Sequence, residues 1–318
     1  MTQKTKQQPI DIKRTRRLVL TGFSMGLADL VPGVSGGTVA FLMGVYDELL
    51  FSIKMVTGKV LSLFVQRKFR QAFQSIPFAF LLPLMGGILL GVFSMVNLVT
   101  FLLDNYPTHI WSVFFGLVLG SAYVVSKRIP AWNINRVALL ALGFIVTFII
   151  VGLPTLSSQP TTAVVFGTGI IASCAMILPG ISGSLIMVIL GQYQYVISAV
   201  ADRDISFLAI FGSGIILGLA MLSRLLGWLL RIHHAATITF LIGVMLGSLR
   251  RVWPWQIENA DHTFSSASPN INGMLVVYLL LGVVGFTIVK KLEKIGVAED
   301  HDDIESKDFN REISSQHD

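Results

Sequence analysis

The chain has 318 residues, of which 53% are hydrophobic and only 13% charged, and its mean hydropathy is +0.72. Soluble domains carry about 25% charged residues, so this deficit excludes an ordinary soluble protein, and the lack of alternating strands predicts a helical integral membrane protein. The formal charge of +6 does not indicate nucleic-acid binding, because the basic residues cluster at the ends of apolar runs, and the single cysteine excludes an intrachain disulfide and a cysteine-based metal site.

The first apolar stretch, residues 18–50, follows a basic N-terminus and is interrupted by PGVSGGT at 32–38. The proline and glycines of this motif should end any helix that reaches them. Basic residues also follow the stretch, between Lys54 and Arg70, so both of its flanks are expected on the cytoplasmic side. Each arm has roughly 14 residues and reaches about 20 Å. We therefore predict a re-entrant helical hairpin with its tip at PGVSGG.

Six further apolar runs have the ~17–25 residues that a spanning helix needs. They cover 79–103, 110–126, 137–153, 206–230, 235–250 and 272–289. A second interrupted stretch, 163–200, contains PGISGS at 179–184 and has nearly neutral flanks, so we expect a second hairpin that enters from the outer side. Counting the crossings places both termini in the cytoplasm. Arg250 and Arg251 then fall outside and oppose the positive-inside rule.

The two interrupted stretches match each other. PGVSGGTVAFLMGVY (32–46) aligns with PGISGSLIMVILGQY at an offset of 179 − 32 = 147, and FLLPLMGGILLG (80–91) aligns with FLAIFGSGIILG at 207 − 80 = 127. Shared motif positions in one order argue against chance similarity of apolar segments. One hairpin plus three spans is an odd number of crossings, so the repeats must be inverted, as in many transporters.

The predicted all-α fold has a basic N-terminus (1–17), a first repeat (18–153), a second repeat (154–290) and a polar, disordered tail (291–318).

The motif predicts an anion site. The second arm of each hairpin is expected to begin near Thr38 or Ser184, so a helix N-terminus with free N–H groups points at the membrane centre. Ser35 and Ser182 can cap these helices or bind a ligand, and phosphate suits such donors. The alternative is that the motif only allows tight packing, but two symmetric copies favour a site. The candidate phosphate-binding residues are Ser35, Gly36, Gly37, Thr38, Ser182, Gly183, Ser184 and Arg224, with Pro32, Gly33, Pro179 and Gly180 at the tips.

Three polar side chains inside apolar segments are further candidates. Arg224 lies seven positions before Arg231, about 10 Å deep, and a charge in a span is functional by default unless it snorkels to the headgroups. Its repeat mate is Asn97. Asp29 could carry a proton, bind a cation, pair with Arg224 or bond nearby backbone. Asp29 and Asn97 are therefore the candidates for coupling to protons or sodium. We expect no metal, cofactor or catalytic residue.

PGVSGGT, PGISGS and the duplicated hairpin-plus-three-spans pattern resemble the bacterial polyprenyl-phosphate transporter family over most of residues 15–290. The resemblance implies a multi-pass protein of the bacterial cytoplasmic membrane whose partner is undecaprenyl (polyprenyl) phosphate. It implies that this lipid carrier is flipped from the outer to the inner leaflet for recycling in cell-envelope synthesis. The phosphate would then sit between the hairpin tips while the prenyl tail stays in lipid.

Two other functions stay open. Undecaprenyl-diphosphate phosphatases also have inverted re-entrant hairpins and a PGxSRSG motif, but Gly183 stands here at the arginine position and no Glu-x-x-x-Glu pair is present in the first hairpin. The chain then lacks the acid–base groups and the phosphate clamp of such an enzyme, so we do not expect an enzyme. A secondary transporter of a small anion would use the same site without a lateral opening for lipid.

Overall fold

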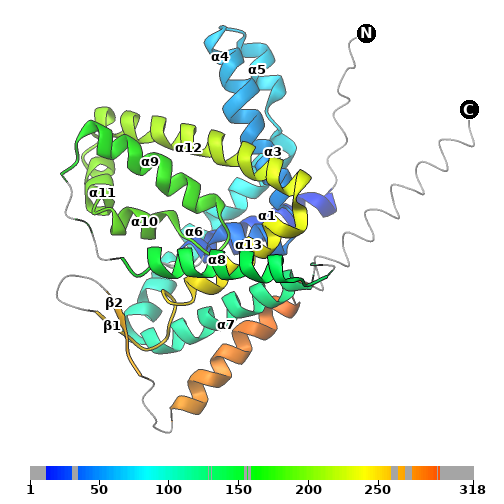
Figure 1. The fold of residues 1–318 in the computed structure, drawn as a ribbon. Coiled ribbons are helices and arrows are strands. Elements are labelled where there is room, and N and C mark those ends of the chain that lie inside the picture. The colour runs from blue at the N-terminus through cyan, green and yellow to red at the C-terminus, as the bar shows by residue number, and fades with distance from the viewer. Residues whose placement is uncertain are drawn as a thin grey trace, which may run out of the picture.

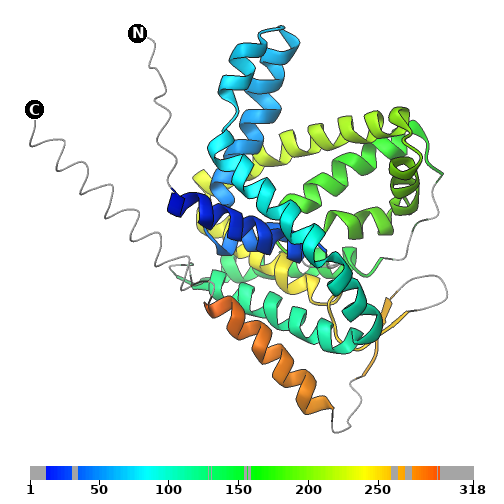
Figure 2. The same ribbon diagram turned by 180° about the vertical axis from the view of Figure 1, so that it is seen from behind.

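The computed structural model describes residues 12–30, 35–127, 129, 131–153, 156, 159–258, 264–268, 274–291 and 293 (Figures 1 and 2). The regular elements of the described chain are helices and one small antiparallel hairpin, of β1 (Gln256–Glu258) and β2 (Phe264–Ser266), which was not predicted. Its first half contains α1 (Ile12–Asp29), α2 (Gly36–Leu42), α3 (Tyr46–Met55), the π-helix η1 (Val56–Val60), α4 (Leu61–Val65), α5 (Phe69–Ser75), α6 (Phe78–Asn105), α7 (Pro107–Ser126) and α8 (Ile134–Ile150). Its second half contains α9 (Thr162–Ile177), α10 (Gly183–Ile189), α11 (Tyr193–Ala201), α12 (Ile205–Ile232), α13 (His234–Ser248) and a last helix at 275–291.

Three of the described helices, α6, α7 and α12, are long and apolar enough to cross a membrane. The shorter helices α8, α9 and α13 are also apolar. This confirms the prediction of a helical, multi-pass membrane protein. Local capping explains several helix starts: Asp204 Oδ1 accepts the N–H of Phe207 at 3.0 Å before α12, and Pro107 begins α7.

The long helices of the two halves share one spacing. α12 begins and ends 205 − 78 = 127 and 232 − 105 = 127 residues after α6, and α13 begins 234 − 107 = 127 residues after α7. Gly44 and Gly191, aligned in the sequence, both have positive φ values, of 73° and 67°. The length of the long helix, the start of the helix that follows it and the backbone turn at the glycine therefore recur at aligned positions.

Each of the two interrupted stretches contains a further helix break, which the sequence did not predict. The first hairpin was expected at 18–50, but α1 begins at Ile12, and the second arm is broken at Gly44 into α2 and α3. In the second half, α10 and α11 meet at an angle of 113° beside Gly191. A left-handed φ favours glycine, so each of these glycines allows a turn inside an apolar run. α3 then continues through η1 into α4, which forms with α5 an arm that projects at the top of Figure 1.

Glycines let the long helices pack at close range, and they do so at aligned positions. α1 packs on α6, and α9 packs on α12. A Cβ built on Gly87 would collide with the carbonyl oxygen of Val19, and one on the aligned Gly214 would collide with that of Phe166. Small residues of this kind allow helix backbones to approach in membrane proteins.

The two halves interlock. α7 of the first half packs on the last helix of the second half, where a Cβ on Gly116 would collide with the carbonyl oxygen of Gly282. α13 of the second half packs on α8 of the first, where a Cβ on Gly243 would collide with that of Leu140. The residue numbers rise together along both pairs, so the paired helices run parallel.

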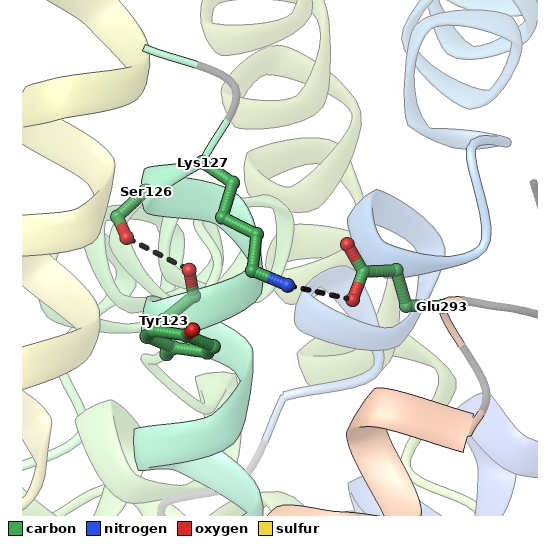
Figure 3. Close-up of polar contacts among 4 residues, drawn as sticks. All are labelled: Tyr123, Ser126, Lys127 and Glu293. Atoms are coloured by element: carbon green, nitrogen blue, oxygen red, sulfur yellow. Dashed lines mark hydrogen bonds and ion pairs between the residues drawn. The ribbon is translucent and has the colours of Figure 1, made fainter.

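Polar and aromatic contacts stabilise the C-terminal end of the parallel pair formed by α7 and the last helix (Figure 3). Lys127 Nζ lies 3.5 Å from Glu293 Oε2 and 4.8 Å from the centre of the Tyr123 ring. Ser126 Oγ donates to the carbonyl oxygen of Tyr123 at 2.7 Å, which closes the last turn of α7. The Tyr123 ring in turn packs on Phe286, with ring centres 5.4 Å apart.

Arg250, which opposed the charge rule, has a structural partner. Its Nη1 donates to the carbonyl oxygen of Phe148 at 2.9 Å, and its guanidinium lies 4.6 Å from the centre of the Phe148 ring. The guanidinium fills the space that a Cβ on Gly152 would take. A cation at carbonyls that end a helix is stabilised by the helix dipole, so Arg250 serves the C-terminus of α8.

Candidate anion site at the paired helix breaks

The two breaks in the helices meet inside the protein. Ser35, which is 1% exposed, accepts the N–H of Gly37 on Oγ at 3.1 Å and donates to the carbonyl oxygen of Leu178 at 3.4 Å. Tyr46 Oη donates to the carbonyl oxygen of Ile177 at 3.0 Å. Both acceptors lie where α9 ends, just before Pro179. The first break is therefore hydrogen-bonded to the second, although Pro32 and Gly33 themselves lie outside the described residues.

Asp29 binds the start of α2. Its Oδ1 accepts the N–H of Gly36 at 2.7 Å, and a Cβ built on Gly36 would lie 2.6 Å from Oδ2. Of the roles considered for Asp29, a carboxylate that bonds nearby backbone is the one seen here, and no described ion pair joins it to Arg224. One N–H donor of α2 is thus already bound within the protein.

The second break is capped differently. α10 begins at Gly183, but the Ser182 side chain makes no capping hydrogen bond to it. Instead, Ser182 Oγ and Ser184 Oγ lie 2.7 Å apart and share one hydrogen bond. The aligned position of Asp29 is Met176, which has no carboxylate. The second break therefore holds two hydroxyl groups at a helix start where no acidic side chain of the described residues is bound.

Close packing requires three of the described motif glycines. A Cβ on Gly37 would lie 3.0 Å from the carbonyl oxygen of Ile177, and one on Gly183 would lie 2.8 Å from that of Ala172. Gly180 has φ +93°, and its Cβ would lie 2.9 Å from the Cα of Met245. Tight packing accounts for these glycines, so the serines carry the argument for a ligand. Thr38 is buried in the first turn of α2, its N–H bonded to the carbonyl oxygen of Ser35 at 2.9 Å.

Arg224 lies in a neighbouring cleft. Its Nη1 donates to the carbonyl oxygen of Ala220 at 3.0 Å, and a Cβ on Gly58 of η1 would lie 3.1 Å from Nη2. The side chain lines a cavity of about 350 Å³ between α12 and α3, and none of the motif residues lines that cavity. Asn97 is exposed on α6 and lines neither the cavity nor the breaks. The structure thus joins Ser35 to the second break and places Arg224 apart from both.

Two cations that accompany Arg224 were not among the predicted site residues. Lys54 and Arg231 line the same cavity. In the sequence these cations follow apolar runs and indicate membrane orientation. The seven-residue spacing of Arg224 and Arg231, two helical turns, was the only local sign that they share a face.

Comparisons with known proteins agree on one family. A family model described as undecaprenyl phosphate translocase-like matches residues 25–268. A polyprenyl-phosphate transporter of Vibrio cholerae serotype O1 is 42% identical over 237 residues, which are 74% of this chain and 77% of the relative. A polyprenyl-phosphate transporter of Staphylococcus aureus is 30% identical over 290 residues, 85% of this chain and 94% of the relative. No solved structure matches significantly.

Proposed function

Because the chain belongs to the undecaprenyl phosphate translocase-like family, we propose that it moves undecaprenyl or another polyprenyl phosphate from the outer to the inner leaflet of the bacterial cytoplasmic membrane. The family and both relatives are named as transporters and not as enzymes, so the chain is a transporter and the phosphatase alternative is set aside. Return of the lipid to the inner leaflet would recycle the carrier of cell-envelope precursors.

The observation that carries the proposal is the contact between the two helix breaks, made by Ser35 Oγ and the carbonyl oxygen of Leu178. Irregular backbone at membrane depth is tolerated where it is buried in protein or lines a wet cavity, and broken helices form the substrate sites of many transporters. We assign the phosphate to this junction, with Ser182, Gly183 and Ser184 as the main donors. The start of α2, with Ser35, Gly36, Gly37 and Thr38, forms the opposite wall of the site. Arg224 lies in the neighbouring cleft, next to the path that we propose for the phosphate.

Two inverted repeats, each with a re-entrant hairpin, are the architecture that we propose around this junction. α6 and α12 run in opposite directions across Figure 2, while α7 and the last helix run parallel. Parallel packing of α8 with α13 fits the same scheme. Aromatic rings gather where α7 begins, since Tyr106, His109 and Tyr278 are in edge contact. Where α7 ends, Lys127 pairs with Glu293, and Lys290 and Lys291 end the last helix. Aromatic and basic residues of this kind mark membrane interfaces, which supports an outer start of α7 and cytoplasmic termini.

Coupling to protons or sodium is assigned to Asp29. Protonation of this carboxylate would weaken its bond to the N–H of Gly36, and so would change the start of α2 next to the substrate. Asn97 remains a coupling candidate only through its alignment with Arg224.

The proposal is tested by measuring outer-leaflet undecaprenyl phosphate on bacteria that lack any second transporter for it. A lipid-phosphate-binding antibiotic reads its exposure with and without the protein. We expect exposure to rise without the protein, and to fall again with the wild-type chain but not with the Ser182→Ala variant. The Ser182 side chain makes no capping hydrogen bond to α10 and bonds the Ser184 hydroxyl, so we expect this variant to express and fold. The Ser213→Ala variant is a matched control, because Ser213 is exposed on α12 and its Oγ bonds its own helix, at Ile210 O.

Other outcomes identify the alternatives. Full activity of normally folded Ser182→Ala and Arg224→Ala variants would contradict the site. Accumulation of undecaprenyl diphosphate with no change in exposure would indicate a phosphatase. No change in either lipid would make a small soluble anion the better substrate.

A further inference from the structure

A basic cleft lies between α12 and the segment formed by α3 and η1, which pack on each other and are drawn side by side in Figure 1. The cavity of about 350 Å³ described above shares three lining residues with a second hollow of about 220 Å³ next to η1. The shared residues are Phe51, Lys54 and Arg224. The two hollows therefore form one cleft, which we call the α3–α12 cleft.

The charge of the α3–α12 cleft is strongly unbalanced. Its cations are Lys54, Lys59, Arg224 and Arg231, whereas Asp47 is the one carboxylate among the described residues that line it. Across the ranges that the structure describes, none of these four cations is ion-paired. Like charges gathered against an apolar helix repel one another, so the cleft is suited to an anion that would neutralise them.

Arg224 is held in place for such an anion. One guanidinium nitrogen bonds the carbonyl oxygen of Ala220, and another lies against Gly58. Gly58 belongs to the π-helix η1, and π-helical turns often occur at functional sites. A guanidinium has five N–H donors in a planar fork that matches phosphate oxygens, so donors remain for a ligand after the bond to Ala220.

The walls of the cleft suit a phosphate that carries a hydrocarbon chain. Phe51 is 55% exposed and Trp228 is 47% exposed, and both line the cleft together with Leu50. An apolar chain could cover these side chains while its headgroup meets the cations. Inorganic phosphate would leave the same apolar surface uncovered.

We propose that the α3–α12 cleft is a second binding site, outside the helix breaks, for a phosphate monoester headgroup borne by a hydrocarbon chain. The cleft adjoins the breaks, because Tyr46 bonds Ile177 at the second break and the next residue, Asp47, lines the cleft. This location would let the cleft bind the headgroup after it leaves the breaks. That role rests on the proposed function.

Binding to the purified full chain tests the proposal, with farnesyl phosphate, farnesol and inorganic phosphate as probes in neutral-lipid nanodiscs. We expect farnesyl phosphate to bind the wild type, and the Arg224→Gln and Lys54→Gln variants to bind it at least tenfold more weakly. The Arg70→Gln variant is a matched control, because it loses the same charge from exposed α5 outside the cleft. Farnesol should bind weakly to every form. Binding of inorganic phosphate as tight as that of farnesyl phosphate would retain the anion site but overturn the lipid source.

A variant that keeps every charge tests the cleft independently, in case the charge variants misfold. Gly58→Ala places a methyl group against Arg224 Nη2 and keeps every charge, so it should also weaken farnesyl phosphate binding. The Gly86→Ala variant is its control, since a Cβ there meets nothing within 4 Å. Unchanged binding in Arg224→Gln, Lys54→Gln and Gly58→Ala would overturn the site. Binding in the cleft without any lipid transport would overturn the proposed function and leave the cleft in place.

Discussion

At the scale of single residues, the two helix breaks differ in how their donors are bound. Asp29 accepts the N–H of Gly36, and Ser35 accepts that of Gly37, so two N–H donors of the first break are already hydrogen-bonded within the protein. Ser182 makes no such bond to its helix, and Met176 stands at the aligned position of Asp29. A ligand would therefore find more free donors at the second break. The first break would respond to that ligand through Asp29 and the Ser35 contact.

Substitution of Asp29 separates its structural role from its coupling role. Asp29→Ala leaves the buried N–H of Gly36 without its acceptor, which costs about 1–3 kcal/mol, so the variant should unfold at a lower temperature in detergent. Asp29→Asn keeps an acceptor oxygen and should be more stable than Asp29→Ala. If Asp29 carries the coupling proton, Asp29→Asn also removes the pH dependence of transport in proteoliposomes. A pH profile in Asp29→Asn that matches the wild type would rule Asp29 out as the proton carrier.

At the scale of elements, Gly44 and Gly191 turn the second arm of each interrupted stretch at aligned positions. Their left-handed backbone costs a residue with a side chain roughly 1–2 kcal/mol, whereas glycine adopts it freely. The turn directs α3 toward α12, where the cleft lies. In the second half the equivalent turn directs α11 toward α12 as well.

The Gly44→Ala and Gly191→Ala variants should each be destabilised, because alanine must adopt φ values near 73° and 67°. The expected loss is roughly 1–2 kcal/mol each, measured as a lower thermal midpoint in detergent. Gly212→Ala is a suitable control, because Gly212 lies within α12 and its Cβ would meet nothing within 4 Å. That control should be neutral or stabilising, since alanine is the better helix former. Equal midpoints for Gly191→Ala and Gly212→Ala would contradict the importance of the turn.

The long helices and the repeat spacing were predictable, because lipid requires ~17–25 apolar residues in a span and duplicated motifs keep their order. The turn at Gly44 was not, since an isolated glycine in an apolar run is tolerated inside a helix and no other residue there marks a turn. The junction of Ser35 with the second break was expected, although its hydrogen bond to Leu178 could not be. The grouping of Arg224 with Lys54 depends on the packing of α12 on α3, which links positions far apart in the chain.

At the scale of the whole molecule, each half packs one of its helices against a helix of the other half. α7 packs on the last helix, and α13 packs on α8, so neither half can bury its glycine-lined face alone. The helix breaks meet inside this interlocked frame, where Met245 of α13 packs against Gly180. A movement of one half relative to the other would therefore change the contacts at the junction of the breaks, where we place the substrate.

Inverted repeats predict that aligned positions face opposite sides of the membrane. Tyr106 follows α6 and His233 follows α12, both are exposed, and they align at 233 − 106 = 127. In a Cys174→Ala background, a membrane-impermeant thiol reagent applied to intact cells should label Tyr106→Cys and leave His233→Cys unlabelled until the membrane is opened. Lys127→Cys should behave like His233→Cys, because it lies at the basic end of α7. Labelling of Tyr106→Cys and His233→Cys from the same side would show that the repeats are parallel, and labelling of His233→Cys alone would place the termini outside.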